Sequence, residues 1–511
     1  MQPFIIYITI MKSKTFYSFF ACFFIGSCMF GCNTNPPIED NPNSSVTTLT
    51  VTPTKDSTTV LHNPLMNLVL YLGSDYNGNW SDPTWYLNDA NTVANCNTVY
   101  IRSAWMNFEP TEGNYVWKNN ASFKNMVAAI KAKGWRLGFR VMCQDDGLSS
   151  TVIHGTPQYV FDAMKAAGYT NPYSIYQPNY PDVTNPVWQD KFKAFILAFG
   201  AEFDDPTITD YVDANGLGLW GEGNLVGISP YNGDHTKEKV YYDWHLGVYA
   251  QAFKHVILDV TSCTFGSWDN DGAEQKATDL SLPIGKYGCI WRRDGMGWDI
   301  NLPYVQFTPE QLLTWTSTFP ACPMICEPWS GFTSTDRDYM NRLIHDVTQW
   351  HGMNLTYNDA WFANPDLLSQ LVTTMGYRLR PVKIELSNNV TSSGKMQIKH
   401  TWTNDGVGVL LNSNIRWNNK YAIAFALFKT TELTPAKIYI DSTANPGVLV
   451  KGINTSFTTN IQWNEPAGNY WLAVGIIDQT MPTNTSLDLA IKPLGRRNGW
   501  YLLNSVSIKS N

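Results

Sequence analysis

The sequence predicts a (β/α)8 barrel followed by an all-β, immunoglobulin-like sandwich. From about residue 64, short apolar segments alternate with amphipathic helices, the alternation repeats eight times, and the pattern changes after Pro381. Eight strand–helix units are what a closed barrel of this class requires. An open doubly wound sheet is the alternative. It usually carries a glycine-rich phosphate turn after its first strand, and residues 72–76, LGSDY, are not such a turn.

The eight predicted barrel strands are short apolar runs bounded by turn residues. They are Asn67–Tyr71, Thr98–Ser103, Arg136–Met142, Gly216–Trp220, Val256–Val260, Tyr287–Trp291, Cys322–Cys326 and Asn354–Tyr357. Helix punctuation separates them: Gly134 ends one helix, Pro186 and Pro309 open two others, and Asn364-Pro365 begins the last. The long segment 144–182 between the third and fourth strands is expected to form a loop over the barrel mouth.

After Pro381 the pattern becomes that of short alternating strands separated by turn residues. The predicted strands are Lys395–Trp402, Tyr421–Phe428, Lys437–Ile440, Phe457–Trp463 and Asn469–Ile477. Alternating strands of this length indicate a β-sandwich.

The N-terminus predicts export. Lys12 and Lys14 precede the apolar run Phe16–Ile25, which is too short for a membrane-spanning helix and is typical of a signal peptide. Small residues before Cys28 and Cys32 favour lipidation of one of them, and an ordinary signal peptide is the alternative. The expected organisation is a signal peptide with lipobox (1–32), a flexible linker (33–60), a barrel catalytic domain (61–380) and a sandwich (381–511). The expected location is that of an outer-membrane, cell-surface or periplasmic lipoprotein.

The composition narrows the class of ligand. A net charge of −7 excludes the basic surface that a nucleic-acid-binding protein needs. Charged residues make up 15% of the chain, against ~25% in an average soluble protein, and the chain has 20 Trp. These values suit neutral, flat ligands such as sugars. No CxxC and no Cys/His zinc spacing is present, so buried thiols are expected, and neither a metal nor a cofactor is expected.

In a barrel of this class the functional side chains follow the strands, at their carboxyl ends. Two carboxylates in such positions are bordered by Trp: Glu222 in GLGLWGEGN and Glu327 in CPMICEPWSG. They are 327 − 222 = 105 residues apart, which is three units at ~35 residues each and places them on opposite strands four and seven. A retaining glycosidase needs two carboxyl groups facing each other in this way. The alternatives are a surface loop acid and a buried acid paired with arginine.

Other polar and aromatic residues that follow the predicted strands are candidates for substrate binding. They are Arg102, Trp105, Arg140, Asp145, Trp220, Asn224, Arg292, Trp329, Asn358 and Trp361. Arg102 and Arg140 either hold a nucleophilic carboxylate in its ionised form or belong to a structural ion pair of the barrel core. The four Trp side chains can present ring faces to the C–H groups of a sugar.

Residues 98–117 (TVYIRSAWMNFEPTEGNYVW) carry a resemblance to a known group. A strand-end arginine followed by an EP-x-EG-x-Y-x-W turn resembles the second-strand region of clan A glycoside hydrolases. Over about residues 62–510 the chain is similar to bacterial, largely Bacteroidetes, glycosidase-type lipoproteins that join a β-galactosidase-like TIM barrel to a C-terminal β-sandwich.

The resemblance implies Glu222 as the acid/base and Glu327 as the nucleophile of a retaining β-glycosidase acting on oligo- or polysaccharides. The clan has Asn directly before the acid/base, where it binds the sugar 2-hydroxyl. This chain has Gly221 there, and Asn224 is the candidate substitute. A glycan-binding lipoprotein without catalysis and an inverting enzyme on the same barrel are the competing hypotheses.

Overall fold

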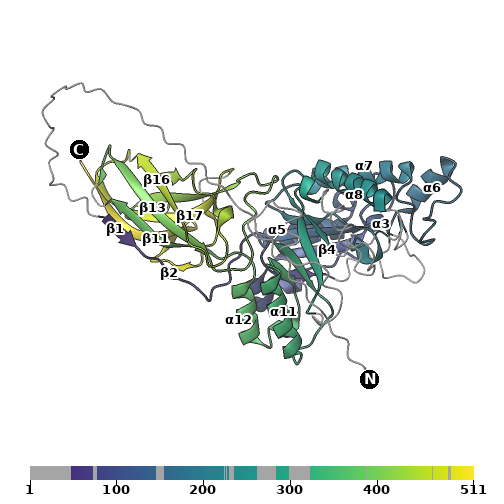
Figure 1. The fold of residues 1–511 in the computed structure, drawn as a ribbon, viewed down its shortest axis with the longest axis horizontal. Helices are drawn as coiled ribbons and strands as arrows, with labels where there is room; N and C mark the ends of the chain where they lie inside the picture. The colour runs from purple at the N-terminus through teal and green to yellow at the C-terminus, as the bar shows by residue number, and fades with distance from the viewer. Residues whose placement is uncertain are drawn as a thin grey trace, which may run out of the picture. The chain divides into compact units, whose positions relative to one another are not determined.

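The computed structural model describes residues 48–72, 78–144, 155–223, 225, 227–229, 235–261, 284–297, 323–387, 390–462, 464–480 and 485–510. Within them, eight parallel strands form one sheet in the order β10-β3-β4-β5-β6-β7-β8-β9 (Figure 1). An isolated parallel bridge between Met324 and Gly352, at the start of β9 and just before β10, brings the two ends of the sheet together. The predicted barrel is therefore confirmed as a nearly closed eight-stranded barrel.

The barrel strands follow the chain order, as expected for repeated βα units. Their bounds are β3 Asn67–Tyr71, β4 Cys96–Ala104, β5 Arg136–Met142, β6 Thr209–Asp213, β7 Ile257–Thr261, β8 Ile290–Met296, β9 Met324–Pro328 and β10 Asn354–Thr356. Seven of the eight predicted strands overlap these. The fourth prediction is wrong, because the strand is Thr209–Asp213 and Gly216–Trp220 lies in the loop that follows it. Glycine disfavours strands, so this glycine-rich run forms a tight loop instead.

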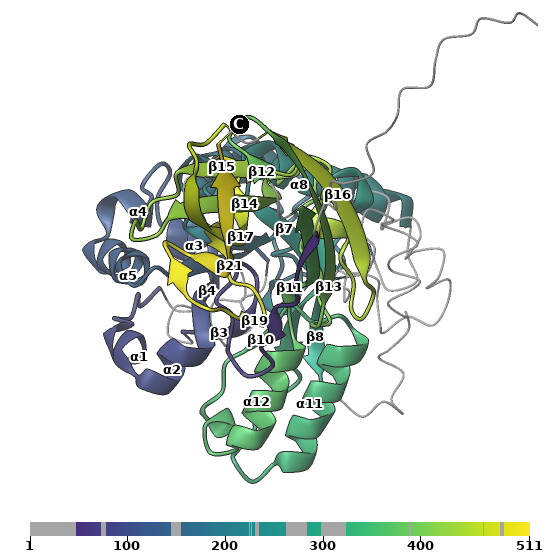
Figure 2. The same cartoon turned by 90° about the vertical axis from the view of Figure 1, so that its left-hand side faces the viewer.

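Helices link the strands. Their bounds are α1 Thr84–Asn88, α2 Ala90–Asn95, α3 Trp105–Phe108, α4 Val116–Asn119, α5 Ala121–Ala132, α6 Gln158–Ala166, α7 Pro186–Phe203, α8 His235–Ala252, α11 Arg337–Gln349 and α12 Pro365–Thr374. Capping residues determine where two of these helices begin. The side chain of Asn120 accepts a hydrogen bond from the backbone amide of Phe123 at the start of α5, and Asn185 caps α7, which has Pro186 in its first turn. Helices α11 and α12 lie side by side (Figures 1 and 2).

The C-terminal region consists mainly of two sheets in which all neighbouring strands are antiparallel except β12 and β21, which are parallel. One contains β1-β11-β13-β16 and the other contains β12-β21-β17-β14-β15. Their bounds are β1 Thr48–Val51, β11 Leu379–Ser387, β12 Val390–Thr391, β13 Lys395–Asn404, β14 Tyr421–Lys429, β15 Lys437–Ile440, β16 Thr455–Gln462, β17 Gly468–Asp478 and β21 Trp500–Lys509. Inward residues of both sheets, among them Ile398 and Phe425, share one hydrophobic core, as in a sandwich. An immunoglobulin-like strand arrangement stays a prediction.

The N-terminal boundary of the sandwich differs from the expectation of a flexible linker up to residue 60. Residues Thr48–Val51 pair with β11 in antiparallel register, and β2 (Thr54–Lys55) pairs with β19 (Ile491–Lys492). Leu49 and Val51 pack against the sandwich core, so backbone pairing and apolar burial hold this segment. The remaining short strands are β18 Thr485–Leu487 and β20 Arg496–Arg497.

The sandwich is bonded directly to the barrel through Arg416. Its guanidinium donates to the carbonyl oxygens of Phe253 at 3.2 Å, Tyr287 at 2.6 Å and Gly288 at 3.0 Å. All three acceptors belong to segments that precede β7 or β8. These bonds therefore lie at the amino-terminal ends of the barrel strands. Functional groups are expected at the opposite, carboxyl-terminal ends.

No helix in the described part of the chain is long and apolar enough to cross a membrane. The proposed signal segment lies outside the described residues.

Candidate functional site

The two glutamates lie at or just after the carboxyl ends of barrel strands four and seven. Glu327 lies within β9, one residue before its end, and Glu222 follows β6 in the loop 214–223. The carboxyl ends of parallel barrel strands meet at one mouth. The charge of Glu327 acts on the titration of Glu222, so the two side chains are electrostatic neighbours. The structure thus brings together the pair that the sequence singled out.

A glycine-rich loop places Glu222. Gly216, Gly218, Gly221 and Gly223 have positive φ values of 75°, 69°, 68° and 86°, which side-chain-bearing residues seldom adopt. The loop is bonded to itself and to the end of β5. The amide of Gly216 donates to the oxygen of Gly221 at 3.0 Å, and the amide of Gly218 donates to Oε1 of Gln144 at 2.8 Å. These bonds fix the backbone on which Glu222 sits.

Gly221 directly precedes Glu222, and the structure gives the reason for glycine at this position. A Cβ at this residue would stand 2.9 Å from Cγ of Met142 and 3.3 Å from Cδ of Arg140. The backbone also has φ +68°. A residue with a side chain would therefore meet both crowding and an unfavourable backbone conformation.

Burial sets the protonation of Glu222. Desolvation, followed by the negative charges of Asp294 and Glu327, raises the pKa of Glu222 to about 7, against the opposing charges of Arg140 and Arg102. A carboxylic acid with such a pKa is protonated in slightly acidic solution and can release its proton near neutrality. This is the behaviour that a general acid/base requires.

Glu327 has a different environment, because it contacts two guanidinium groups. Oε2 accepts a hydrogen bond from Nη2 of Arg292, on the neighbouring strand β8. Oε1 lies 3.6 Å from Nη1 of Arg102, on β4. Arg102 is itself positioned by Tyr71 at the end of β3, whose hydroxyl accepts from Nε at 3.0 Å. Two guanidinium groups from different strands thus contact one carboxylate.

A buried ion network lies beside the two glutamates. Nε of Arg140 donates to Oδ2 of Asp213 at 2.6 Å, and both side chains are fully buried. Asp294 accepts from Nε of Arg292 at 2.7 Å and from Nη2 of Arg140 at 3.3 Å. Burial alone would raise the pKa of Asp294, but Arg292, Arg140 and Arg102 outweigh burial and lower it. Arg140 thus takes the structural role left open by the sequence, whereas Arg102 contacts the candidate nucleophile.

The four candidate Trp side chains divide into two pairs. Trp220 and Trp329, beside the two glutamates in sequence, are 40% and 48% exposed and can present ring surface to a ligand. Trp105 and Trp361 are fully buried. The expectation that these two contact substrate does not agree with the structure. Trp105 donates its indole N–H to Glu109 at 2.9 Å, inside the turn whose sequence carried the family resemblance.

The other predicted residues are placed as follows. Asn358 caps a short turn, because its Oδ1 accepts the amide of Ala360 at 2.9 Å and its Nδ2 donates to the oxygen of Phe332 at 3.1 Å. It lines an open cavity of about 580 Å³ between the loops after β9 and β10. Asp145, Asn224, Cys28 and Cys32 lie outside the described residues.

Sequence reasoning missed one acid of the site, Asp213, and assigned no role to another, Asp294. Asp213 was missed because the fourth strand was placed at Gly216–Trp220, although the β-branched and aromatic run TDYVD was a signal for the true strand. Asp294 follows the predicted sixth strand directly, but no pattern in the sequence shows that it bonds to both Arg140 and Arg292. Tyr71 was missed for the same reason.

The chemistry available here is that of two carboxyl groups in contrasting environments. In the described residues no cluster of three or more His, Cys, Asp or Glu side chains is arranged to hold a metal ion. The four described cysteines, Cys96, Cys143, Cys289 and Cys326, are buried free thiols, as expected from the sequence. Burial raises the pKa of each of them, so they are poor nucleophiles.

No protein-family model matches the chain, and no curated protein matches it. Several solved structures are similar at low sequence identity. An endogalactoceramidase is 11% identical, with 69% of this chain and 91% of that chain covered and a TM-score of 0.38. Endo-glycoceramidase II from Rhodococcus sp., as a lactosyl-enzyme intermediate, is 12% identical, with 81% and 99% covered and a TM-score of 0.39. A psychrophilic family 10 endo-β-1,4-xylanase is 9% identical, with 57% and 85% covered and a TM-score of 0.34.

Proposed function

We propose that the protein is a glycoside hydrolase that cleaves β-linked glycans with retention of configuration. The observation that carries the proposal is the contrast between two neighbouring carboxyl groups: burial raises the pKa of Glu222 to about 7, and Arg292 and Arg102 surround Glu327. In a retaining glycosidase one carboxyl group must hold a proton while the other stays charged. When the environments of two acids differ in this way, the acid with the raised pKa is assigned as the acid/base and the other acid as the nucleophile.

In the proposed first step, the carboxylate of Glu327 forms a bond to the anomeric carbon while the bond to the leaving oxygen breaks. Glu222 gives its proton to that oxygen, and the leaving group departs as an alcohol. In the second step, the Glu222 carboxylate takes a proton from a water molecule that attacks the anomeric carbon. The bond to Glu327 breaks, and both residues return to their first state.

Two alternatives make different predictions. An inverting enzyme needs carboxyl groups ~6.5–9.5 Å apart rather than ~5–5.5 Å, and it forms no covalent intermediate. A glycan-binding protein without catalysis needs aromatic surface such as Trp220 and Trp329, but it has no need of a proton-bearing acid beside an ionised one. A β-galactosidase-like preference is a finer proposal that rests only on the resemblance of residues 98–117.

The test is a pair of variants assayed on activated aryl β-glycosides. Glu327→Ala should abolish glycosyl-enzyme formation. Glu222→Ala should still cleave substrates with good leaving groups, and azide should raise its turnover and give a β-glycosyl azide, because azide attacks the intermediate without a general base. A β-glycosyl azide from Glu327→Ala together with an inverted, α-glycosyl azide from Glu222→Ala would show that the two roles are exchanged. Full activity in both variants would refute the assignment.

We also propose export, lipid anchoring and the division at about residues 60 and 380. The supporting observations are the basic and apolar segments before Cys28 and Cys32, and the change from parallel to antiparallel strands at β11. Labelling with a lipid precursor should mark the protein in bacteria. A Cys28→Ala/Cys32→Ala double variant should lose the label, and retained label would contradict the lipobox.

A further inference from the structure

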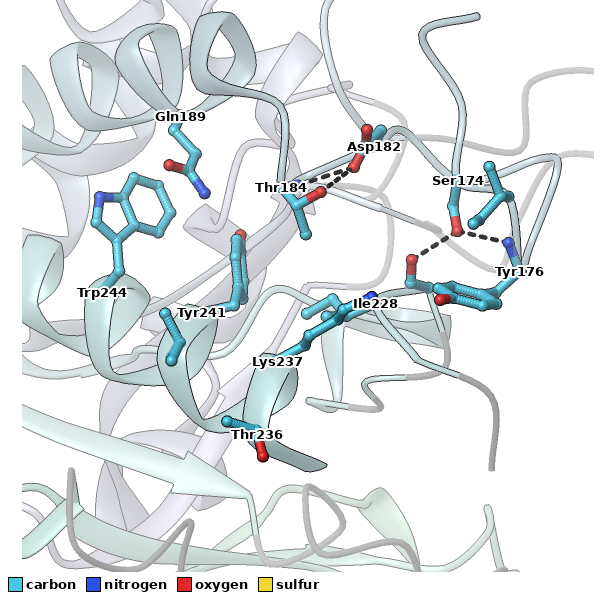
Figure 3. A pocket seen from close by; sticks show the side chains of 13 residues that line it. Ser174, Tyr176, Asp182, Thr184, Gln189, Ile228, Thr236, Lys237, Tyr241 and Trp244 are labelled. Atoms are coloured by element: carbon cyan, nitrogen blue, oxygen red, sulfur yellow. Dashed lines mark hydrogen bonds between the residues drawn. The ribbon is translucent and has the colours of Figure 1, made fainter. Parts of the chain in front are cut away.

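A second cavity, of about 640 Å³, opens beside the loop that carries Glu222 (Figure 3). We call it the loop pocket. It lies between residues 174–184 of the segment after β5, Gly227–Ile228 of the loop after β6, and residues 236–244 of α8. Its volume falls within the ~300–1,000 Å³ of small-molecule sites.

The topology places the loop pocket on the same side of the barrel as the two glutamates. Residues 174–184 lie between α6 and the start of α7, the helix that leads back to the beginning of β6. Gly227 and Ile228 follow β6, and the α8 residues of the pocket belong to the first three turns of that helix. Gly227 is five residues from Glu222, so their Cα atoms lie within ~18 Å of each other. A short oligosaccharide can span this distance.

The two loops are bonded to each other at the pocket. The hydroxyl of Ser174 donates to the carbonyl oxygen of Gly227 at 2.6 Å and accepts the amide of Tyr176 at 3.1 Å (Figure 3). Ser174 is buried. This bond fixes one wall of the pocket to the segment that carries Glu222.

The lining combines ring surfaces with polar groups. Trp244 and Tyr241 of α8 lie on one side of the cavity, and Tyr176 lies on the other (Figure 3). Lys237 and Asp182 also line the cavity and carry opposite charges, so the lining has no net charge from these groups. Aromatic faces with a few polar groups and balanced charge suit a neutral sugar ring better than an anion or a purely apolar chain.

Tyr241 supplies an unused hydrogen-bonding group. Its side chain is only 3% exposed, and its hydroxyl has no hydrogen-bond partner among the described residues. A buried hydroxyl without a partner is costly, and a ligand hydroxyl that bonds to it removes this cost. Tyr249, two turns further along α8, has an equally buried hydroxyl without a partner in the described structure, but it does not line the pocket.

We propose that the loop pocket binds a neutral sugar unit of the glycan substrate, at a position removed from the cleaved bond. The enzyme then recognises an oligosaccharide chain rather than a terminal monosaccharide alone. This inference rests on the proposed glycosidase function, and it assigns Tyr241, Trp244 and Tyr176 to the recognition of chain length.

The test compares Tyr241→Phe with Tyr249→Phe. Each variant loses one hydroxyl from the same helix, and neither hydroxyl is needed for a described hydrogen bond, so both should fold. The probes are neutral β-linked oligosaccharides of two to six units and the matching p-nitrophenyl monosaccharides. In Tyr241→Phe the ratio of kcat/KM for the longest cleaved oligosaccharide to that for the aryl glycoside should fall about tenfold, a loss typical of one hydrogen bond. In Tyr249→Phe the ratio should not change.

Binding separates failure of this inference from failure of the proposed function. The same oligosaccharides are titrated against the full chain carrying Glu327→Gln, with and without Tyr241→Phe. If the parent chain hydrolyses none of the probes but Tyr241→Phe weakens oligosaccharide binding, the pocket assignment stands and the glycosidase proposal fails. If the chain hydrolyses glycans and Tyr241→Phe changes neither the kcat/KM ratio nor binding, or if Tyr249→Phe has the same effect, the pocket assignment is wrong.

Discussion

The loop after β6 and the end of β9 each carry a glutamate to the same barrel mouth, but they do so by different means. Glu222 lies in a loop with four glycines of positive φ, and its carboxyl group forms no salt bridge with the residues that the structure describes. Glu327 stands on a regular strand whose neighbour β8 supplies Arg292. The environment of Glu222 is desolvated and contains charges of both signs, from Asp294 and Glu327 and from Arg140 and Arg102. The environment of Glu327 is rich in positive charge.

The comparison shows that backbone conformation and charge act together to give two identical side chains different chemistry. A regular strand places Glu327 where the guanidinium groups of other strands can reach it. Glu222 lies in a tight loop, and the charges of Arg140 and Arg102 oppose the rise of its pKa. Burial and Asp294 then dominate its titration. Four predictions test this account, in order of decreasing effect.

Arg292→Met should have the largest effect. It removes one of the two cationic partners of both Asp294 and Glu327, and breaking a buried ion pair costs ~3–5 kcal/mol of unfolding free energy. Chemical denaturation measures this loss, and activity should fall with it. The matched control is Arg337→Met, which breaks an exposed pair with Asp366 and should cost much less. Equal losses would contradict the importance of the buried network.

Glu222→Gln should lower kcat/KM by ~10²–10⁴ on substrates with poor leaving groups. In the parent protein, activity should fall as pH rises through about 7, because Glu222 then loses its proton. Its folded pKa exceeds the ordinary value of 4.5, so its contribution to stability is complete below pH 4.5 and is lost as pH rises to about 7.

The same variant gives a second readout that does not depend on activity. Glu222→Gln should not lose stability in this way. Its free energy of unfolding should rise by roughly 1–3 kcal/mol relative to that of the parent between pH 4.5 and pH 8. Denaturation midpoints at a series of pH values measure the difference. Parallel stability curves for the two proteins would mean that the environment of Glu222 does not raise its pKa.

Gly221→Ala should cost ~1–3 kcal/mol and reduce activity, because the added Cβ meets Met142 and the backbone has φ +68°. Gly452→Ala is the control: its φ is +75°, but nothing lies within 4 Å of the added Cβ. It should show only the backbone cost of about 1 kcal/mol and no loss of activity. An active Gly221→Ala enzyme with normal stability would show that the loop is less constrained than its bonding indicates.

Trp220→Ala and Trp329→Ala should have the smallest effect, a rise in KM of ~10-fold with little change in thermal stability, because both rings are substantially exposed. Steady-state kinetics on an oligosaccharide measures the change. Leu494→Ala in the sandwich, at a side chain that is 73% exposed, serves as the control and should leave KM unchanged. A fall in thermal stability without a change in KM would show that the two rings contribute to packing rather than to substrate binding.

The sequence predicted the barrel strands well where local patterning and burial agree. Asn67–Tyr71 and Arg136–Met142 were assigned with the bounds that the structure has, and Pro186 begins α7 as predicted. In these segments the side-chain periodicity matches the element that forms. The fourth strand was misplaced because an apolar, glycine-rich segment has the hydrophobicity of a strand but not its backbone preference.

The strand-end rule also found the two glutamates, because a repeated βα pattern determines which residues arrive at the barrel mouth. It did not distinguish Trp220 and Trp329 from the buried Trp105 and Trp361, since all four follow predicted strands. Whether a Trp side chain is buried depends on which distant segments of the chain pack over it, and the residues around that Trp in the sequence do not determine this.

The sequence by itself determined the eight-unit barrel, the antiparallel strands after Pro381 and the two candidate carboxyl groups, because each follows from short-range periodicity and position along the chain. Only the tertiary structure decided that Arg140 pairs with Asp213 and that Arg292 joins Asp294 to Glu327. Those partners lie up to 73 residues apart along the chain. Their bonds form when neighbouring and opposite strands close around a common interior, where low polarity makes each charge depend on its partner.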